Sequence, residues 1–359
     1  EVVGNMSSQE AYEMAQDVHG KLSSMPPWEL PAAIKYLSAL AVSHSGKDYV
    51  AKDFYVPRNV IKDLSPTIEK LSPRQAVRML YFLAKMKQHP GPNVLQQLAQ
   101  RFEASMECMS GRERWSLVGA KDLSMLLHAY AQLEEPLPEA LGRTLESRLI
   151  GACDQITPQG QSLIMLAFAK LQWKADDELL RELVGRCSES IDEFKLIEMC
   201  NFLIGAARLG AHLPPPLLDR IEARALAHDD RISFRDVSSI YSTLLRLGRT
   251  PSAALAERFA KELERHTVGG AEADGFSLSH SAADVFLAAA SLGAEDLERV
   301  PLGLIMSAVE TVPECFSRKQ ALFCVWALEA LVASGKAEVP ASLLHTLRAR
   351  AERGESEGS

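Results

Sequence analysis

The sequence predicts an all-α protein, built as an α-solenoid of about seven to eight stacked antiparallel helix pairs. Seven times along the chain, an apolar residue that closes one helical pattern is followed twelve positions later by an apolar residue inside the next. From Leu133 to Leu247 the first residue of each pair recurs every 38 residues. No Asn-Gly hairpin and no sustained alternation of apolar and polar residues favours a β-sheet. A constant unit length is typical of stacked helical repeats.

These pairs predict seven repeats, and we call the first residue of each pair the anchor. A first helix ends near the anchor, a second helix contains its partner, and both residues are expected to be core contacts. In chain order the pairs are Met86 and Leu98, Leu133 and Leu145, Leu171 and Leu183, Leu209 and Ile221, Leu247 and Phe259, Leu292 and Leu304, and Leu331 and Leu343. Residues 28–41 (WELPAAIKYLSALA) predict a degenerate unit before the first pair.

The first helix of each repeat is predicted from the residues that precede its anchor. Positions three and seven before it are mostly apolar, as at Tyr130 and Leu126 or at Phe168 and Ile164. They share one face of a helix with 3.6 residues per turn, so we expect a buried stripe. The residue four positions before the anchor is small, which lets a neighbouring helix approach closely: Ala129, Ala167, Gly205, Thr243, Ala288 and Ala327.

Helix-end signals separate the two helices of a repeat. A glycine directly follows three anchors, where a left-handed residue would end the first helix: Gly210, Gly248 and Gly293. Prolines predict the start of the second helix, at Pro138, 214–216, Pro251 and Pro340. A leucine eight positions after the anchor then forms one apolar ridge with the anchor's partner: Leu141, Leu179, Leu217 and Leu255.

The domain organisation follows from where the repeat pattern holds. Residues 1–25 are predicted to be an N-terminal extension or capping helix. Residues 26–351 are predicted to form the solenoid, and residues 352–359 a disordered tail. Two repeats are longer, with 47 and 45 residues between anchors, and predict surface loops at 111–114 and 268–275.

Composition excludes several classes of protein. Of the 359 residues 47% are hydrophobic and 24% charged, which indicates a globular rather than a disordered chain. The six cysteines have no C-x-x-C spacing and fit reduced, buried thiols better than a disulfide framework or a zinc site: Cys108, Cys153, Cys187, Cys200, Cys315 and Cys324. No run approaches the roughly 18 to 20 apolar residues of a membrane span, so no membrane insertion is predicted.

No enzyme, cofactor or metal site is predicted. The chain lacks a phosphate-binding G-x-x-x-x-G-K-[ST] loop, a G-x-G-x-x-G turn, an H-E-x-x-H helix and a G-x-S-x-G elbow. His280 and Asp284, at i and i+4, could together hold a metal ion. A lone pair of this kind is more often a solvated helix face.

The segments at 122–133 (DLSMLLHAYAQL) and 162–183 (SLIMLAFAKLQWKADDELLREL) resemble the octotricopeptide and heptatricopeptide repeats and the related FAST-kinase-like and RAP-domain proteins. The phrase that ends the first helix in those families stands here as AYAQL, AFAKL, GAARLG and TLLRLG. The resemblance covers residues 70–345 and implies an organellar protein, in the mitochondrial matrix or a plastid, that handles RNA or belongs to the organellar ribosome. No C-terminal RAP domain is evident, which weakens any implied nuclease or processing activity.

One row of residues is a candidate RNA contact. The position just before the anchor is Lys85, Gln132, Lys170, Arg208 and Arg246 in five successive repeats. Stacking would align these side chains, and a single strand along them would meet repeated positive charges. The alternative is that the helix macrodipole favours cations in the last turn of any helix. The aromatic residues on or beside the apolar stripe are predicted to be core, with Tyr81 and Trp326 the two most expected to reach the surface: Tyr81, Phe82, Phe168, Tyr241, Phe286 and Trp326.

Residues 57–121 form a basic segment in an acidic chain. They contain 11 Lys or Arg and 5 Asp or Glu, whereas the whole chain has a net charge of −8. An RNA contact through 57–121 is one interpretation, and an ordinary surface or a patch that docks an acidic protein is the other. The candidate RNA-binding residues of the segment and of the row are Arg74, Arg78, Lys85, Lys87, Arg112, Arg114, Lys121, Lys170, Arg208 and Arg246.

Two functional hypotheses follow. The first is a non-catalytic subunit of a mitochondrial ribonucleoprotein, most simply the mitochondrial ribosome, that contacts ribosomal or messenger RNA and neighbouring proteins. The second is a protein–protein scaffold of another large organellar assembly, such as a respiratory or ATP synthase complex. The family resemblance and the basic segment favour the first hypothesis. The acidic net charge favours the second, because nucleic acid is drawn to basic surfaces.

Overall fold

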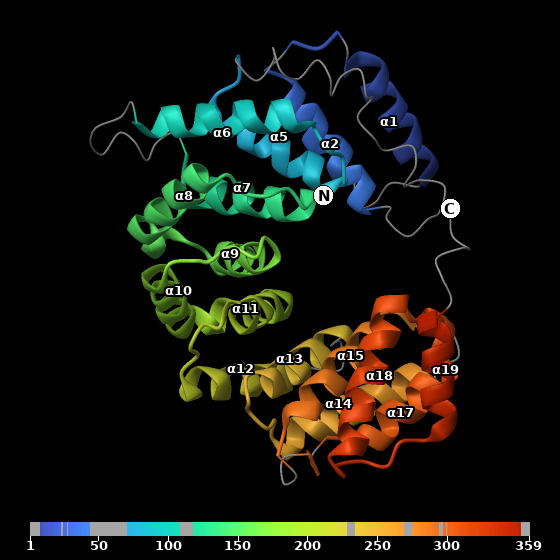
Figure 1. Cartoon of the computed structure of the whole chain (residues 1–359). Helices are drawn as coiled ribbons and strands as arrows, with labels where there is room; N and C mark the ends of the chain where they lie inside the picture. The colour runs from blue at the N-terminus through green and yellow to red at the C-terminus, as the bar shows by residue number, and fades with distance from the viewer. Residues whose placement is uncertain are drawn as a thin grey trace. The chain divides into compact units, whose positions relative to one another are not determined.

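The computed structural model describes residues 8–22, 24–26, 28–43, 70–107, 118–227, 234–268, 275–293, 297–298 and 300–352. These residues form sixteen α-helices and three short 3-10 helices and contain no strand (Figure 1). The predicted all-α fold class is therefore confirmed. The chain divides into two compact units, Glu1–Ser190 and Ile191–Ser359, which we call unit 1 and unit 2.

Unit 1 contains two layers of helices. In the first layer α2, α5, α7 and α9 pack against one another in chain order, and α1 packs against α2. In the second layer α6, α8 and α10 follow one another in the same way. The bounds are α1 Ser8–Leu22, α2 Leu30–Ser43, α5 Pro73–Lys85, α6 Pro92–Glu107, α7 Ala120–Leu133, α8 Glu139–Gly151, η3 Cys153–Gln155, α9 Pro158–Lys170 and α10 Asp177–Ser190.

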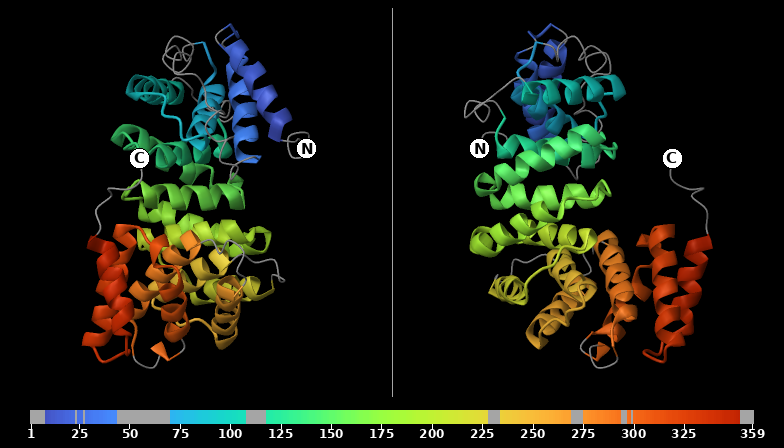
Figure 2. Two further views of the ribbon diagram at one scale, coloured as in Figure 1. Left: turned by 90° about the vertical axis from the view of Figure 1, so that its right-hand side faces the viewer. Right: turned by 60° about the vertical axis from the view of Figure 1, so that its left-hand side comes forward.

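Unit 2 repeats this order, and Figure 2 shows its helices in sequence from yellow-green to red. Its first layer is α11, α13, α15 and α18, and its second layer is α12, α14, α17 and α19. The bounds are η4 Ile191–Glu193, α11 Leu196–Leu209, α12 Pro215–Ala227, α13 Phe234–Arg246, α14 Ala253–Val268, α15 Gly275–Ser291, α17 Leu302–Thr311, η5 Pro313–Cys315, α18 Arg318–Ala333 and α19 Ala341–Glu352.

In five consecutive repeats the first helix ends with the same backbone geometry. The residue after the anchor has a left-handed backbone conformation at Lys87 (φ 54°), Glu134 (56°), Gln172 (52°), Gly210 (68°) and Gly248 (71°). The next residue donates its N–H to the carbonyl three positions before the anchor, as from Trp173 to Phe168 at 3.0 Å. This is the Schellman arrangement. The left-handed helix ends predicted at Gly210 and Gly248 are confirmed, and three other residues adopt the same conformation without being glycine.

The predicted small position and apolar ridge are confirmed. The small residues predicted four positions before the anchor are all buried, in six repeats from Ala129 to Ala327. The ridge leucines are buried as well, with Leu141, Leu179 and Leu255 fully inaccessible. Six of the seven anchor partners are also in the core: Leu98, Leu145, Leu183, Ile221, Phe259 and Leu343.

The prediction for Leu304 is wrong. It is 41% exposed, and the adjacent Ile305 is 1% exposed and occupies the core. In the first five repeats the second helix begins six residues after the anchor, whereas α17 begins ten residues after Leu292. α19 also begins ten residues after its anchor, Leu331, and its partner Leu343 is buried, so α17 turns a different face to the core for a reason other than its late start.

The anchors were also predicted to be core residues, and five of them are only partly buried: Met86, Leu133, Leu171, Leu209 and Leu247. They stand on the last helical residue or just beyond it, where the chain turns away from the neighbouring helix. Leu331 is fully buried because α18 continues two residues past it.

Buried glutamates connect successive repeats in both units. Thirteen positions after its anchor, Glu146 in α8 accepts hydrogen bonds from the backbone N–H of Asp176 at 2.8 Å and from Nε1 of Trp173 at 3.1 Å. Glu222 occupies the same position in α12 and accepts from the N–H of Ser252 at 2.6 Å. Each carboxylate satisfies a donor just before the next second-layer helix, and this compensates for its own burial.

The chain ends and insertions are described only in part. Helix α1 lies within the predicted capping segment 1–25. The predicted loop at 111–114, and all of the tail but Glu352, lie outside the described residues, and the boundaries at 25 and 351 stay predictions. Among the helices described, none has both the length and the apolarity needed to cross a bilayer.

Candidate functional site

Positions one, five, eight and twelve before the anchor form one row on each first helix, which is mostly partly exposed, although Met125 of α7 and Ser242 of α13 are buried in it. This spacing of i, i+4, i+7 and i+11 defines one helix face, which we call the open face. The position five before the anchor is an aromatic ring in two repeats of unit 1, Tyr81 and His128. In unit 1 the open face comprises Arg74, Arg78, Tyr81 and Lys85 of α5, Lys121, Met125, His128 and Gln132 of α7, and Gln159, Leu163, Leu166 and Lys170 of α9.

Arg74 and Arg78 form ion pairs between neighbouring helices. The Nε atoms of both guanidinium groups lie 3.2 Å from the carboxylate of Asp122 in α7, which is 1% exposed. The same carboxylate accepts a hydrogen bond from the N–H of Gly119 at 3.2 Å and so caps α7. The two candidate RNA-binding arginines thus compensate a buried charge, while their half-exposed side chains still reach solvent.

Two aromatic rings lie between lysines at the other end of this face. The rings of Tyr81 and His128 are 5.7 Å apart between centroids, and Nζ of Lys85 lies 5.6 Å from the Tyr81 centroid. Gln132 contacts the ring of His128, with 3.4 Å between Nε2 atoms. Lys85 and Lys170 are exposed, so positive charge borders the two half-buried rings.

The protonation states at this place follow from burial and the lysines. Burial lowers the pKa of His128 to about 4, and the charges of Lys170 and Lys85 act in the same direction. Burial also raises the pKa of Tyr81. At neutral pH both rings are therefore uncharged. Proteins that bind single-stranded nucleic acid combine uncharged rings with neighbouring cations, because bases stack on rings and phosphates pair with cations.

The remaining candidate residues lie apart from this cluster. Lys121 is exposed at the opposite end of α7 from Gln132, and Lys87 lies beyond the end of α5 in its left-handed position. Arg112 and Arg114 lie outside the described residues. His128 was not predicted as a site residue. It stands five residues before its anchor, as Tyr81 does, so the sequence contained the signal that could have found it.

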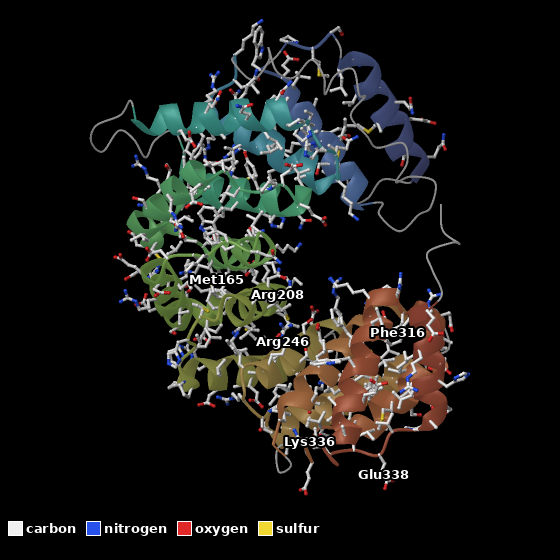
Figure 3. All side chains as sticks on the ribbon, viewed as in Figure 1. Met165, Arg208, Arg246, Phe316, Lys336 and Glu338 are labelled. Carbon is white, nitrogen blue, oxygen red and sulfur yellow. The ribbon has the colours of Figure 1, made fainter. Side chains whose placement is uncertain are left out.

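In unit 2 the open face borders a pocket of about 650 Å³. Arg208 of α11 and Arg246 of α13 line it, and both are labelled in Figure 3. Across from them are Asp284 of α15 and Lys319 and Phe323 of α18. Nη1 of Arg246 lies 3.9 Å from Oδ1 of Asp284, and Nζ of Lys319 lies 5.8 Å from the Phe323 centroid. Lys319 and Phe323 were not predicted as site residues.

In the part of the chain that the structure describes, no group of three or more His, Cys, Asp and Glu side chains is arranged to hold a metal ion. The side chain of His280 lies outside the described residues, so its pairing with Asp284 stays a hypothesis. Burial raises the pKa of Cys153 to about 11 and that of Cys324 to about 12, and both are thiols that remain protonated at neutral pH.

No protein-family model matches the chain, and no curated protein matches its sequence. The resemblance to octotricopeptide-like repeats therefore stays a prediction.

Proposed function

We propose that this protein is a non-catalytic helical-repeat protein that binds single-stranded RNA on the open face of unit 1. The observation that carries the proposal is the Tyr81–His128 ring pair, held uncharged between Lys85 and Lys170. Base stacking on such rings contributes about 1 to 3 kcal/mol per base, and it tolerates any sequence. Exposed lysines beside the rings supply contacts to phosphates, so affinity should fall as salt rises.

The helix pairs in this proposal stack as an α-solenoid with a repeat of about 38 residues. The consecutive packing of first helices within each unit and the five identical helix ends support it. The family resemblance supports a place in the mitochondrial matrix, with a plastid as the alternative, and in a ribonucleoprotein, most simply the mitochondrial ribosome. Ribosomal or messenger RNA would be the ligand.

A second candidate function is a protein scaffold in another large organellar assembly, such as a respiratory or ATP synthase complex. Exposed apolar side chains on α18 favour it, because Leu322, Phe323 and Trp326 are between 41% and 63% exposed. Apolar surface of this kind marks protein interfaces. The two functions are compatible when RNA and protein partners use different units.

The decisive variant is the double change Lys85→Glu/Lys170→Glu, tested on the full chain with a fluorescent oligouridylate of 20 nucleotides. We expect affinity to fall at least tenfold and the salt dependence of binding to weaken by about two charges. Arg74 and Arg78 are poorer choices, since replacing them would leave the buried Asp122 carboxylate unpaired and endanger the fold.

The matched control is Lys174→Glu/Arg181→Glu, which makes the same charge change at two exposed residues outside the open face. It should leave binding within twofold of the wild type. Equal losses in both double variants would mean that binding follows net charge and not this site. Loss of co-sedimentation of the native protein with a large particle after RNase treatment would support the ribonucleoprotein, and a stable protein-only complex would contradict it.

A further inference from the structure

The open face changes chemistry in the last first-layer helix, α18. Its positions twelve, eight and five before the anchor are Lys319, Phe323 and Trp326, where α5 has Arg74, Arg78 and Tyr81. Trp326 is 63% exposed and Phe323 is 41% exposed. Trp326 was one of the aromatic residues expected to reach the surface, and this prediction is confirmed.

A neighbouring position shows that this end of the layer is open. Position nine before the anchor faces the next first helix and is buried in the six earlier repeats, at Val77, Ser124, Ser162, Cys200, Ser238 and Ala283. In α18 the same position is Leu322, which is 49% exposed. No further first helix packs on α18 within the described residues. A leucine there extends the apolar surface of Phe323 and Trp326.

The adjoining pocket concentrates positive charge in an acidic unit. Residues 191–359 contain 18 Lys or Arg and 24 Asp or Glu, yet three cations and one carboxylate line the pocket. Arg208 has no carboxylate within ion-pair distance among the residues that the structure describes. Nε2 of Gln320, a 9% exposed residue that lines the pocket, likewise has no acceptor in the described part of the chain. The pocket therefore offers donors to an anionic ligand.

We propose that this pocket and the adjoining surface of Leu322 and Trp326 dock an acidic peptide segment of a partner protein. Carboxylates of the segment pair with Arg208 and Arg246, whose planar guanidinium groups suit bidentate contact with carboxylate. An apolar side chain of the segment packs against Phe323 and Trp326. Tryptophan and arginine together are the residue types that contribute most at protein interfaces.

The composition of the pocket favours a peptide over RNA. Asp284 places a carboxylate beside Arg246, which disfavours the continuous negative charge of an RNA backbone more than the few carboxylates of a peptide. Leu287 in the pocket and Leu322 beside it are aliphatic and enlarge the apolar surface around Phe323, which suits apolar side chains of a peptide. In unit 1 the open face has aromatic rings at two adjacent helices and no carboxylate at its four positions. The docking proposal is therefore independent of the RNA proposal.

The test starts from a phage-displayed library of random 14-residue peptides, selected on the full-length protein. Selection is followed by fluorescence anisotropy with the best synthetic peptides. We expect enriched sequences that combine two or more Asp or Glu with an aromatic or aliphatic residue. Their affinity should fall at least tenfold in Arg208→Glu/Arg246→Glu and in Phe323→Ala/Trp326→Ala.

Two control variants separate this site from general effects. Lys261→Glu changes an exposed charge of α14, and Leu304→Ala removes an exposed apolar side chain of α17, so both should bind within twofold of the wild type. Circular dichroism checks that each variant folds. Selection that yields no peptide dependent on the pocket would overturn the proposal. An oligouridylate that loses affinity in the same two double variants would also overturn it and would assign the pocket to RNA.

Discussion

The open faces of the two units share one helix register and differ in chemistry. In unit 1 the row presents arginines and lysines around two uncharged rings, with the buried Asp122 beneath the arginines. In unit 2 it presents Arg208 and Arg246 opposite the apolar surface of α18. The positions that pack are alike in both units: small four residues before the anchor, and a buried leucine eight residues after it in most repeats. Packing therefore constrains the scaffold, and solvent-facing positions are free to carry different binding functions.

The largest expected effect distinguishes the buried carboxylate of unit 1 from its counterpart in unit 2. Asp122 and Glu198 each cap a first helix through a backbone N–H, but only Asp122 also pairs with two arginines. We expect Asp122→Ala to destabilise unit 1 by about 3 kcal/mol, because two charge-assisted contacts and a cap are lost. Glu198→Ala should cost unit 2 only about 1 kcal/mol, as the loss of a cap.

Hydrogen exchange measured by mass spectrometry separates the two effects, since peptides from α5 and α7 report on unit 1 and peptides from α11 report on unit 2. Asp122→Asn serves as the intermediate variant, because an amide oxygen can still cap α7 but carries no charge. Equal costs for Asp122→Ala and Glu198→Ala would show that the arginine pairs contribute nothing to stability.

A smaller difference between the units is expected in how their stability changes as the pH is lowered. The folded pKa of His128 is about 4, below the value of about 6.5 in an unfolded chain. Between these values the unfolded state binds more protons, so stability is full above pH 6.5 and falls as the pH is lowered towards 4. We expect unit 1 to lose about 2 kcal/mol between pH 7 and pH 4.5 beyond the loss in His128→Phe.

The matched position in α13 is Ser242, which does not titrate in this range. Hydrogen exchange of α13 in unit 2 should therefore respond equally to acid in the wild type and in His128→Phe. If His128→Phe has the same acid profile as the wild type in α7 as well, the imidazole has the same pKa in the folded and unfolded states, and burial does not keep the ring uncharged on acidification.

Local periodicity made the helices predictable, and long-range pairing limited the prediction of the site. The cations just before the anchors could be found in the sequence because the repeat has a nearly fixed length. The pairing of Arg78 with Asp122 joins residues 44 positions apart, and charge counting, which interpreted Arg78 as part of an RNA contact, an ordinary surface or a protein-docking patch, could not register it. Leu304 was misplaced because a fixed spacing of twelve does not register which face of α17 packs in the core, where Ile305 takes its place.

The smallest expected effect concerns the helix ends. Residues after the anchor are left-handed in both units, but unit 1 uses Lys87, Glu134 and Gln172 where unit 2 uses Gly210 and Gly248. A side chain in this conformation costs roughly 1 kcal/mol, which glycine avoids. Gln172→Gly should therefore stabilise unit 1 by about 0.5 to 1 kcal/mol, because the strain outweighs the added entropy of the unfolded chain.

The reciprocal change tests the same argument in unit 2. A Cβ atom added at Gly210 would have no neighbour within 4 Å, so Gly210→Ala should lose about 1 kcal/mol through backbone conformation alone. Gly185→Ala in α10 is the control, since it also meets no neighbour but has helical geometry, and it should stabilise by about 0.5 to 1 kcal/mol. Urea unfolding followed by circular dichroism measures all three changes. A stabilising Gly210→Ala would mean that the left-handed residue is not required to end α11, and the shared helix end would then have no energetic basis.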